Sequence, residues 1–290
     1  ASSAVKYVLK EAMKDTLLIE LRTEELPPKA LARLGQTFAE KIILDLHARQ
    51  LVDAAAGYSW FATPRRLAVQ VMEVRAQAPD QAFTEKLMPV AVAFDGEGKP
   101  TQALLKKLEA KGLGPERIAG FERRMDGKAE ALFYSDVKPG AQLAQVIAES
   151  VVAALKALPI PKLMRWGDSE HQFVRPVHGL VMLHGAQVLA GEVLGLASGN
   201  RTLGHRFMGE RELLIDHANH YEAILEEYGA VMPSFVKRRA EIEMRLLMAA
   251  GDAVPEEYEA LLDEVTALVE WPVVYAGQFD PAFLAVPQEC

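Results

Sequence analysis

The residues of this chain best suited to chemistry are arginines at expected turns and strand ends, several of them beside aromatic, histidine or glycine residues. A guanidinium is planar and always charged, and its fork of N–H groups binds phosphate, while an aromatic or histidine ring can stack on an exposed base. The pattern therefore indicates phosphate or nucleic-acid binding. Ion pairing with nearby acidic residues is the competing interpretation, and the arginines alone favour it. The set consists of Arg65, Arg66, Arg165, Arg175, Arg201 and Arg206, with Trp166, His178 and His205 as neighbouring rings.

Histidines offer the other candidate chemistry. Six of the seven lie between His171 and His220, and His217 and His220 are spaced to share one face of a helix. A metal site needs two or more converging ligands, but the chain has no HExxH motif. It also lacks GxSxG, GxGxxG and P-loop motifs, and its single cysteine, Cys290, allows no intrachain disulfide. We therefore predict no catalytic residue and no metal ligand, and keep a histidine-dependent metallohydrolase as the weakest alternative.

Charge is distributed unevenly over the 290 residues, whose net charge is −8. Residues 210–290 hold 5 Lys and Arg against 17 Asp and Glu, whereas residues 1–150 hold 21 against 20 and residues 151–209 hold 6 against 3. An acidic segment repels phosphate, so nucleic-acid contacts are expected within the first 209 residues. Inside the acidic segment, the run Lys237-Arg238-Arg239 is interpreted as a solvated helix face.

The composition is that of a globular protein, because half of the residues are apolar and a quarter are charged. The longest apolar runs are far shorter than the roughly 20 residues that span a bilayer, and no secretory signal is evident. Together with the single cysteine, these features predict a cytoplasmic protein without a membrane segment.

Hydrophobic periodicity predicts the elements that position the arginines. Alternating or continuous apolar runs predict strands, and apolar residues three and four apart predict helices. Pro64-Arg65-Arg66 falls between two expected strands, and the run 199–207 is expected to be a glycine-rich loop. The predicted fold class is α+β, a mixed or antiparallel sheet with covering helices, followed by a helix-rich acidic segment. Expected strands are 16–21, 58–61, 67–74, 129–137, 177–183, 188–194 and 273–276, and expected helices are 28–51, 102–111, 142–158 and 258–269.

The same signals suggest how the chain divides into domains. Residues 13–78 together with 139–209 are predicted to form one α+β region, and residues 79–138 a small inserted subdomain. Residues 210–290 are predicted to be a helix-rich segment that begins the next domain. Residues 1–12 precede Met13 and are interpreted as an appendage, either native or added.

Six short motifs occur in one order along the chain and resemble those of the β subunit of bacterial glycyl-tRNA synthetase. The resemblance runs from about Met13 to Cys290, which corresponds to the N-terminal part, less than half, of such a subunit. Agreement of six motifs in order and spacing argues against chance. The motifs are TEELPPKAL (23–31), ATPRRLAVQV (62–71), LPIPKLMRWG (158–167), FVRPVHGL (173–180), LGHRFMG (203–209) and LVEWPVV (268–274).

The resemblance implies a role in an α2β2 class II synthetase that attaches glycine to tRNA(Gly). In that family the α subunit holds the catalytic site with ATP and Mg²⁺, so no cofactor is expected in this chain, which alone is expected to be inactive. The β subunit binds tRNA and ends in HD-like and anticodon-binding domains, expected beyond Cys290. Its N-terminal region resembles the body and tail of archaeal CCA-adding enzymes, which hold the acceptor arm and elbow of tRNA. The arginines and rings named above then become candidate tRNA contacts.

A second hypothesis needs no RNA contact by this chain. Its loops would then pack on the α subunit or on later β-subunit domains, making the chain an interaction module for protein partners only. The acidic net charge of −8 favours this alternative slightly.

Overall fold

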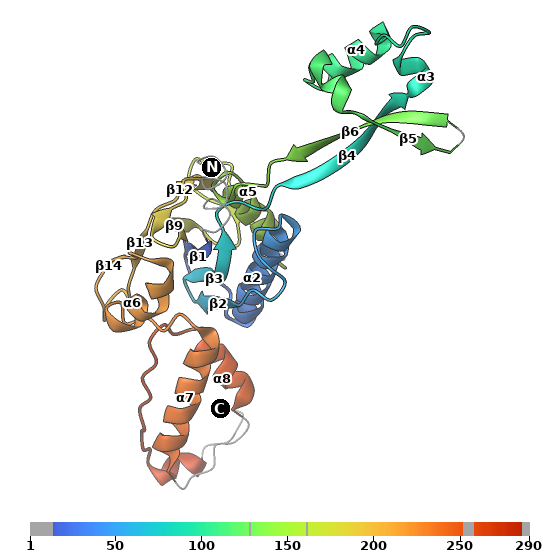
Figure 1. Cartoon of the computed structure of the whole chain (residues 1–290). Helices are drawn as coiled ribbons and strands as arrows, with labels where there is room; N and C mark the ends of the chain where they lie inside the picture. Colours follow the sequence, from blue (N-terminus) through green and yellow to red (C-terminus); the bar gives the residue numbers. More distant parts are fainter. Residues whose placement is uncertain (1–13, 128, 161, 252–257, 286–290) are drawn as a thin grey trace. The chain divides into compact units, whose positions relative to one another are not determined.

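The computed structural model describes residues 14–127, 129–160, 162–251 and 258–285 (Figure 1). The chain forms two compact units, one built from residues up to Ala78 together with those from Ala141 onward, the other from Pro79–Gly140. The structure combines helices with antiparallel sheets, which confirms the predicted α+β class. No helix among the described residues is long and apolar enough to cross a membrane.

A five-stranded antiparallel sheet organises the first unit. Strand β1 lies at its centre and is buried almost throughout, because both faces of the sheet are covered. Consecutive β1 residues therefore serve two different cores: Leu17, Ile19 and Leu21 face one, and Leu18 faces the other. The strand order is β10 (Gln187–Val188), β9 (Val177–His184), β1 (Lys14–Thr23), β3 (Arg66–Arg75) and β2 (Tyr58–Thr63).

Helices α2 (Leu31–Ala48) and α5 (Leu143–Lys156) cover the first face of the sheet (Figure 1). The apolar residues of α2 that recur three and four apart are buried there, as the periodicity predicts. Helix α2 packs closely on β2, because Gly35 lies so near this strand that a Cβ atom would sit 2.8 Å from both Ala62 Cβ and Trp60 Cε3. This glycine therefore sets the helix–sheet distance.

The second face of the sheet is covered by a smaller layer (Figure 1). Leu18, Phe61 and Val181 of the sheet pack there with Leu213 and Tyr221 of the covering layer. Phe61 and Tyr221 meet edge to face with ring centroids 5.2 Å apart. The covering elements are β13 (Arg201–Leu203), β14 (Glu212–Leu214), η3 (Ala218–His220) and α6 (Tyr221–Glu227).

Helices α7 (Phe235–Ala250) and α8 (Glu259–Thr266) form the helix-rich end of the described chain. Arg238 of α7 is fully buried, and its guanidinium donates to Ala62 O (2.7 Å), Met232 O (2.6 Å) and Thr266 O (3.0 Å). Burial lowers the pKa of Arg238 to about 10. The interpretation of residues 237–239 as a solvated face is therefore wrong for Arg238, which ties α7 to β2 and α8.

The second unit is a three-stranded antiparallel sheet with helices on one side. Leu87 of β4 and Leu132 of β6 share a small core with Leu104 and Leu108 of α4. Thr101 caps α4, since its hydroxyl accepts a hydrogen bond from Leu104 N, as its position before the apolar run predicts. The elements are β4 (Gln81–Pro89), α3 (Val90–Ala93), α4 (Gln102–Glu109), η2 (Pro115–Gly120), β5 (Glu122–Asp126) and β6 (Ala129–Lys138).

Two expected strands differ from those observed. The run 188–194 does not form one strand: Gln187–Val188 and Glu192–Val193 are separate short strands, and Leu194 and Gly195, with positive φ (52° and 78°), form the turn that follows the second. Residues 273–276 form no strand, and Tyr275 is 87% exposed. The remaining short elements are η1 (Pro28–Ala30), β7 (Met164–Arg165), β8 (Gln172–Phe173), β11 (Glu192–Val193), β12 (Leu196–Ala197) and η4 (Pro281–Ala285).

We expect Gly35→Ala to destabilise the chain even though alanine favours helix. The added Cβ would overpack the α2–β2 contact, at a cost of about 1–3 kcal/mol, which exceeds the helix-propensity gain of at most about 1 kcal/mol. Gly199→Ala is the matched control, because a Cβ at this position meets nothing within 4 Å. Urea unfolding of both variants measures the difference, and equal midpoints would contradict the overpacking argument.

Candidate nucleic-acid interface

Several of the candidate arginines meet at the end of the sheet where β1 finishes and β3 and β9 begin. Backbone hydrogen bonds tie the segment after β1 to the β2–β3 turn and to the residue before β9, so these three segments hold fixed positions. Side chains that are more than 100 residues apart in sequence are thereby brought together. The bonds run from Thr23 N to Arg65 O (2.8 Å), from Leu26 N to Pro64 O (2.6 Å) and from Glu24 N to Pro176 O (2.8 Å).

Two surface hollows with shared walls lie at this edge. One, of about 140 Å³, is lined by Arg22, Arg65, His178 and Arg206 among others. The other, of about 260 Å³, is lined by Arg65, His205 and Arg206 with Phe207 and Trp271. Arg65 and Arg206 line both, so the two hollows adjoin each other. We call the five basic residues Arg22, Arg65, His178, His205 and Arg206 the arginine surface.

The two central arginines of this surface keep their charge available. Within the described ranges, neither Arg65 nor Arg206 forms an ion pair. Arg65 is half-buried and Arg206 is exposed, so both guanidinium groups can reach an external anion.

Arg22 belongs to the arginine surface but was absent from the sequence-based candidates, because it lies inside a strand. Gly179 on the neighbouring strand β9 leaves room for its guanidinium, which donates to His178 O (3.0 Å). Burial lowers the pKa of Arg22, and its Nε has no hydrogen-bond partner in the described part of the chain. The only sequence signal for Arg22 is its place at the end of an apolar run, just before Thr23.

Arg175 and His178 are held by the same edge. The Arg175 Nε donates to Glu25 O (2.8 Å), and the His178 Nε2 lies 2.9 Å from Glu24 Oε1. His178 is exposed, but its Nε2 is already in contact with a carboxylate, so it is less available to an anion than Arg65.

Arg66, which adjoins Arg65 in sequence, also lines the smaller hollow, but its side chain is buried among carboxylates. It is 2% exposed and its guanidinium is paired with buried carboxylates, so the structure favours a structural role for Arg66 over the predicted RNA contact. Its Nη1 lies 3.2 Å from Glu20 Oε2, its Nη2 donates to Leu203 O (2.9 Å), and its Nε lies 3.5 Å from Glu270 Oε1. Successive strand residues face opposite sides, and the turn between β2 and β3 gives only one of two adjacent arginines to the solvent.

The buried carboxylates around Arg66 are also bound by hydroxyl groups. Tyr221 OH donates to Glu20 Oε2 (2.6 Å), Thr202 Oγ1 donates to Glu20 Oε1, and Thr63 Oγ1 donates to Glu270 Oε1 (2.8 Å). Burial raises the pKa of the Tyr221 phenol well above its usual value, and the nearby Glu20 raises it further. Burial would also raise the pKa of Glu270, but the charge of Arg66 and the bond from Thr63 lower it below 4.5. The charge of Arg66 and the Thr63 hydroxyl therefore stabilise the charged form of the Glu270 carboxylate.

The structure does not bring the other predicted contacts to the arginine surface. Arg165 is exposed and pairs with Glu170 at 2.8 Å, while Trp166 packs partly buried against the first core. Arg201 lies 3.9 Å from Glu212 in a separate hollow that is also lined by Asp216 and other acidic residues. An anion approaching Arg201 would therefore meet carboxylates.

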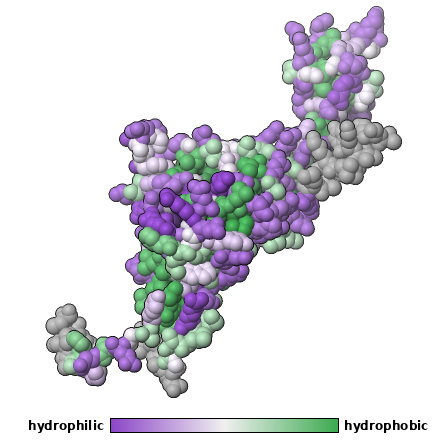
Figure 2. Space-filling view, turned by 90° about the vertical axis from the view of Figure 1, so that its left-hand side faces the viewer, coloured by the Kyte–Doolittle hydropathy of each residue, from purple (hydrophilic) through white to green (hydrophobic). Residues whose placement is uncertain are grey.

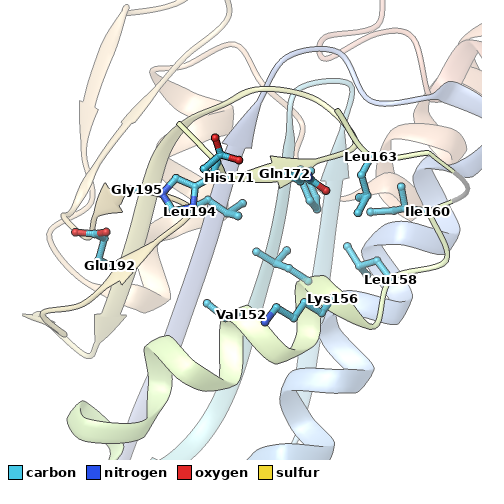
Figure 3. Close-up of a pocket in the computed structure, with 13 residues that line it drawn as sticks. Val152, Lys156, Leu158, Ile160, Leu163, His171, Gln172, Glu192, Leu194 and Gly195 are labelled. Atoms are coloured by element: carbon cyan, nitrogen blue, oxygen red, sulfur yellow. The ribbon is translucent and has the colours of Figure 1, made fainter. Parts of the chain in front are cut away.

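A mainly apolar hollow of about 560 Å³ lies at a different site, beside the end of α5 (Figure 3). Val152, Leu158 and Leu194 line it, with Lys156 and His171 among its polar groups. Among the described residues, no group of three or more His, Cys, Asp and Glu could hold a metal ion. The metallohydrolase hypothesis therefore has no site in that part of the chain.

Comparison with known proteins gives a consistent assignment. A family model described as glycyl-tRNA synthetase beta subunit matches residues 17–290. The chain is 59% identical over 277 residues to a protein named glycine–tRNA ligase beta subunit from Aromatoleum aromaticum, covering 95% of this chain and 40% of the relative. Beta subunits of the same name from Ralstonia nicotianae and Neisseria meningitidis are 50% and 49% identical over 95% and 96% of the chain and 40% of each relative. The chain thus spans about two-fifths of the length of these relatives.

Arg66→Met should destabilise the fold strongly. It leaves the Glu20 and Glu270 carboxylates buried without their cation, and breaking a buried ion pair in this way costs about 3–5 kcal/mol. Arg201→Met removes an exposed pair instead and should cost less than about 1 kcal/mol. Urea unfolding compares them, and a similar small loss in both variants would refute the structural role of Arg66.

The Glu270 carboxylate should make part of the stability depend on pH. Its folded pKa lies below 4.5, so its stabilising effect is present above pH 4.5 and is lost as the pH falls through the folded pKa. Glu270→Gln should therefore be most destabilising near neutral pH, with a difference from the parent that shrinks as the solution is acidified. The exposed Glu212→Gln is the control. A difference that stays constant over the acid range would exclude this linkage.

Proposed function

The chain belongs to the glycyl-tRNA synthetase beta subunit family, and we propose that it serves such a synthetase by binding tRNA at the arginine surface. The observation that supports this most directly is that Arg65 and Arg206 both line the two hollows. Neither arginine forms an ion pair in the described ranges. A tRNA presents a dense row of phosphates, which are the natural ligands of such guanidinium groups.

The scaffold beneath the arginine surface supports the same proposal. Arg65 sits on a turn whose backbone is bonded to Thr23 and Leu26, and the adjacent Arg66 is fixed by buried carboxylates. Little side-chain and loop freedom remains to be lost when a phosphate binds, which favours affinity. From the resemblance described above, the bound part of the RNA would be the acceptor arm or elbow.

The remaining features of the proposed enzyme follow from family membership. The synthetase would be an α2β2 heterotetramer in which the α subunit binds glycine, ATP and Mg²⁺, and this chain would carry no cofactor. The chain by itself would not charge tRNA(Gly), and its contribution would be to position that tRNA and to dock on the α subunit.

One observation favours protein contacts as well. The acidic end of the chain exposes several apolar side chains, and Figure 2 shows hydrophobic surface among hydrophilic residues at the level of α7 and α8. Met248 is 75% exposed and Leu261 is 62% exposed. Apolar groups in an acidic segment suit a protein partner rather than RNA. The interaction-module hypothesis therefore fits this segment, while tRNA binding fits the arginine surface.

Replacing either central arginine should weaken tRNA binding and its dependence on salt. We expect Arg65→Ala and Arg206→Ala each to lower the affinity for tRNA(Gly) about tenfold, and to reduce the slope of log affinity against log salt by roughly 1. Each loss reflects one phosphate contact with its released counterions. A salt series measured by fluorescence anisotropy tests this.

Arg201→Ala is the matched control, an exposed arginine in an acidic hollow, and its binding and slope should stay close to those of the parent. If all three variants bind tRNA as the parent does, the arginine surface is not the RNA contact. If the parent shows no binding at low salt, this chain serves subunit docking instead.

A further inference from the structure

The loop between β13 and β14 carries a conspicuously exposed aromatic ring. Phe207 is 84% exposed and Met208 is 53% exposed, although large apolar side chains are usually buried. Arg206 precedes them and is one of the two central residues of the arginine surface. The ring of Phe207 lines the same hollow as Arg65 and Arg206.

This loop is clamped at both ends onto the backbone after α6. His205 N donates to Gly229 O (2.7 Å), and Glu210 N donates to Tyr228 O (2.8 Å). A Cβ on Gly204 would lie 2.8 Å from Gly229 Cα, and a Cβ on Gly209 would lie 2.1 Å from Gly229 O. Both positions therefore require glycine, because a side chain there would push the loop off its support.

The tip of the loop is fixed from within as well. Phe207 N donates to His205 Nδ1 (3.2 Å), and the two rings meet edge to face with centroids 6.2 Å apart. A hydrophobic ring is thus held in water at a defined place by a loop that has little freedom to bury it. Such a preorganised ring is suited to binding a flat apolar surface.

The groups around the Phe207 ring indicate which kind of ligand would supply the flat apolar surface. A nucleotide offers a flat base to an aromatic ring and a phosphate to a guanidinium, and the Phe207 hollow supplies both groups side by side. Inside a double helix each base is covered by its neighbours on both sides, and only a terminal pair keeps one free face. The ring therefore fits an unpaired nucleotide better than a base-paired one within a helix.

We propose that Phe207 is a stacking platform for an unpaired nucleotide of the RNA that binds the arginine surface. This inference rests on the proposed tRNA binding and adds a preference for single-stranded RNA next to a duplex. The duplex would supply phosphates to Arg65 and Arg206, and the unpaired nucleotide would lie on Phe207.

Two RNA hairpins with the same fluorescent label test the proposal, one blunt-ended and one carrying a short unpaired extension at its end. The parent chain should bind the extended hairpin more tightly. Phe207→Ala should abolish this preference, lowering affinity for the extended hairpin at least about fivefold and for the blunt hairpin much less. Phe207→Tyr should retain the preference, because it keeps a ring that can stack.

Phe279→Ala is the matched control, since Phe279 is 69% exposed and lines neither hollow of the arginine surface. Its binding to both hairpins should equal that of the parent. Circular dichroism of each variant establishes that the fold is intact, as expected for replacements of exposed side chains.

The outcomes separate this inference from the function it rests on. If Arg206→Ala weakens both hairpins but Phe207→Ala changes neither, tRNA binding stands and the stacking role is wrong. If Phe207→Ala weakens both hairpins equally, the ring does not select unpaired RNA. If Phe207→Ala weakens only the association with a purified α subunit, the ring contacts protein. If the parent binds neither hairpin, the proposed function itself fails.

Discussion

A buried cation between two buried carboxylates holds the first unit together. Arg66 on β3 meets Glu20 on β1 and Glu270 after α8, and thus joins the central strands to a segment about 200 residues further on. Charges taken out of water are costly unless each is paired and hydrogen-bonded, and here hydroxyl groups of Tyr221 and Thr202 complete the shell of Glu20. The ion pairs and hydrogen bonds of this network therefore form only when the sheet, its second covering layer and the end of the chain are all in place.

This internal constraint also determines what the surface can do. The turn that buries Arg66 directs Arg65 outward, and Leu203 O, which accepts from Arg66, immediately precedes the loop that carries Arg206. The buried arginine therefore positions both exposed arginines, although it contacts no ligand. Arg65 and Arg66 are the same residue type in nearly the same sequence context, but one side chain reaches the solvent and the other is buried, so their roles differ.

The sequence predicted much of the fold because the first sheet and its helices follow strong periodicity. Leu67, Val69 and Val71 lie in the first core as their alternation indicates. Side-chain burial at turns was harder, since Pro64-Arg65-Arg66 contains no signal for which arginine turns inward. Arg22 was missed for the complementary reason: a strand residue is expected to pack, and only the opposing Gly179 makes room for its guanidinium. The burial of Arg66 and the placement of Arg22 at the site both depend on contacts between distant segments, which local sequence patterns do not contain.

A chain with a net charge of −8 can still bind phosphate, because salt confines electrostatic effects to about 10 Å at ordinary ionic strength. What counts is the charge within that distance of the site. Several carboxylates near the end of the chain are already in ion pairs: Arg239 alone pairs with Glu243, Glu259 and Asp263. The hollows at the sheet edge also contain Glu24, Glu25 and Glu270, but Glu270 pairs with Arg66 and Glu24 lies 2.9 Å from His178. Arg65 and Arg206 have no ion pair in the described ranges and leave their charge to an external anion. The ion pairs near the site therefore decide the sign of the electrostatic potential there, and the net charge of the chain does not.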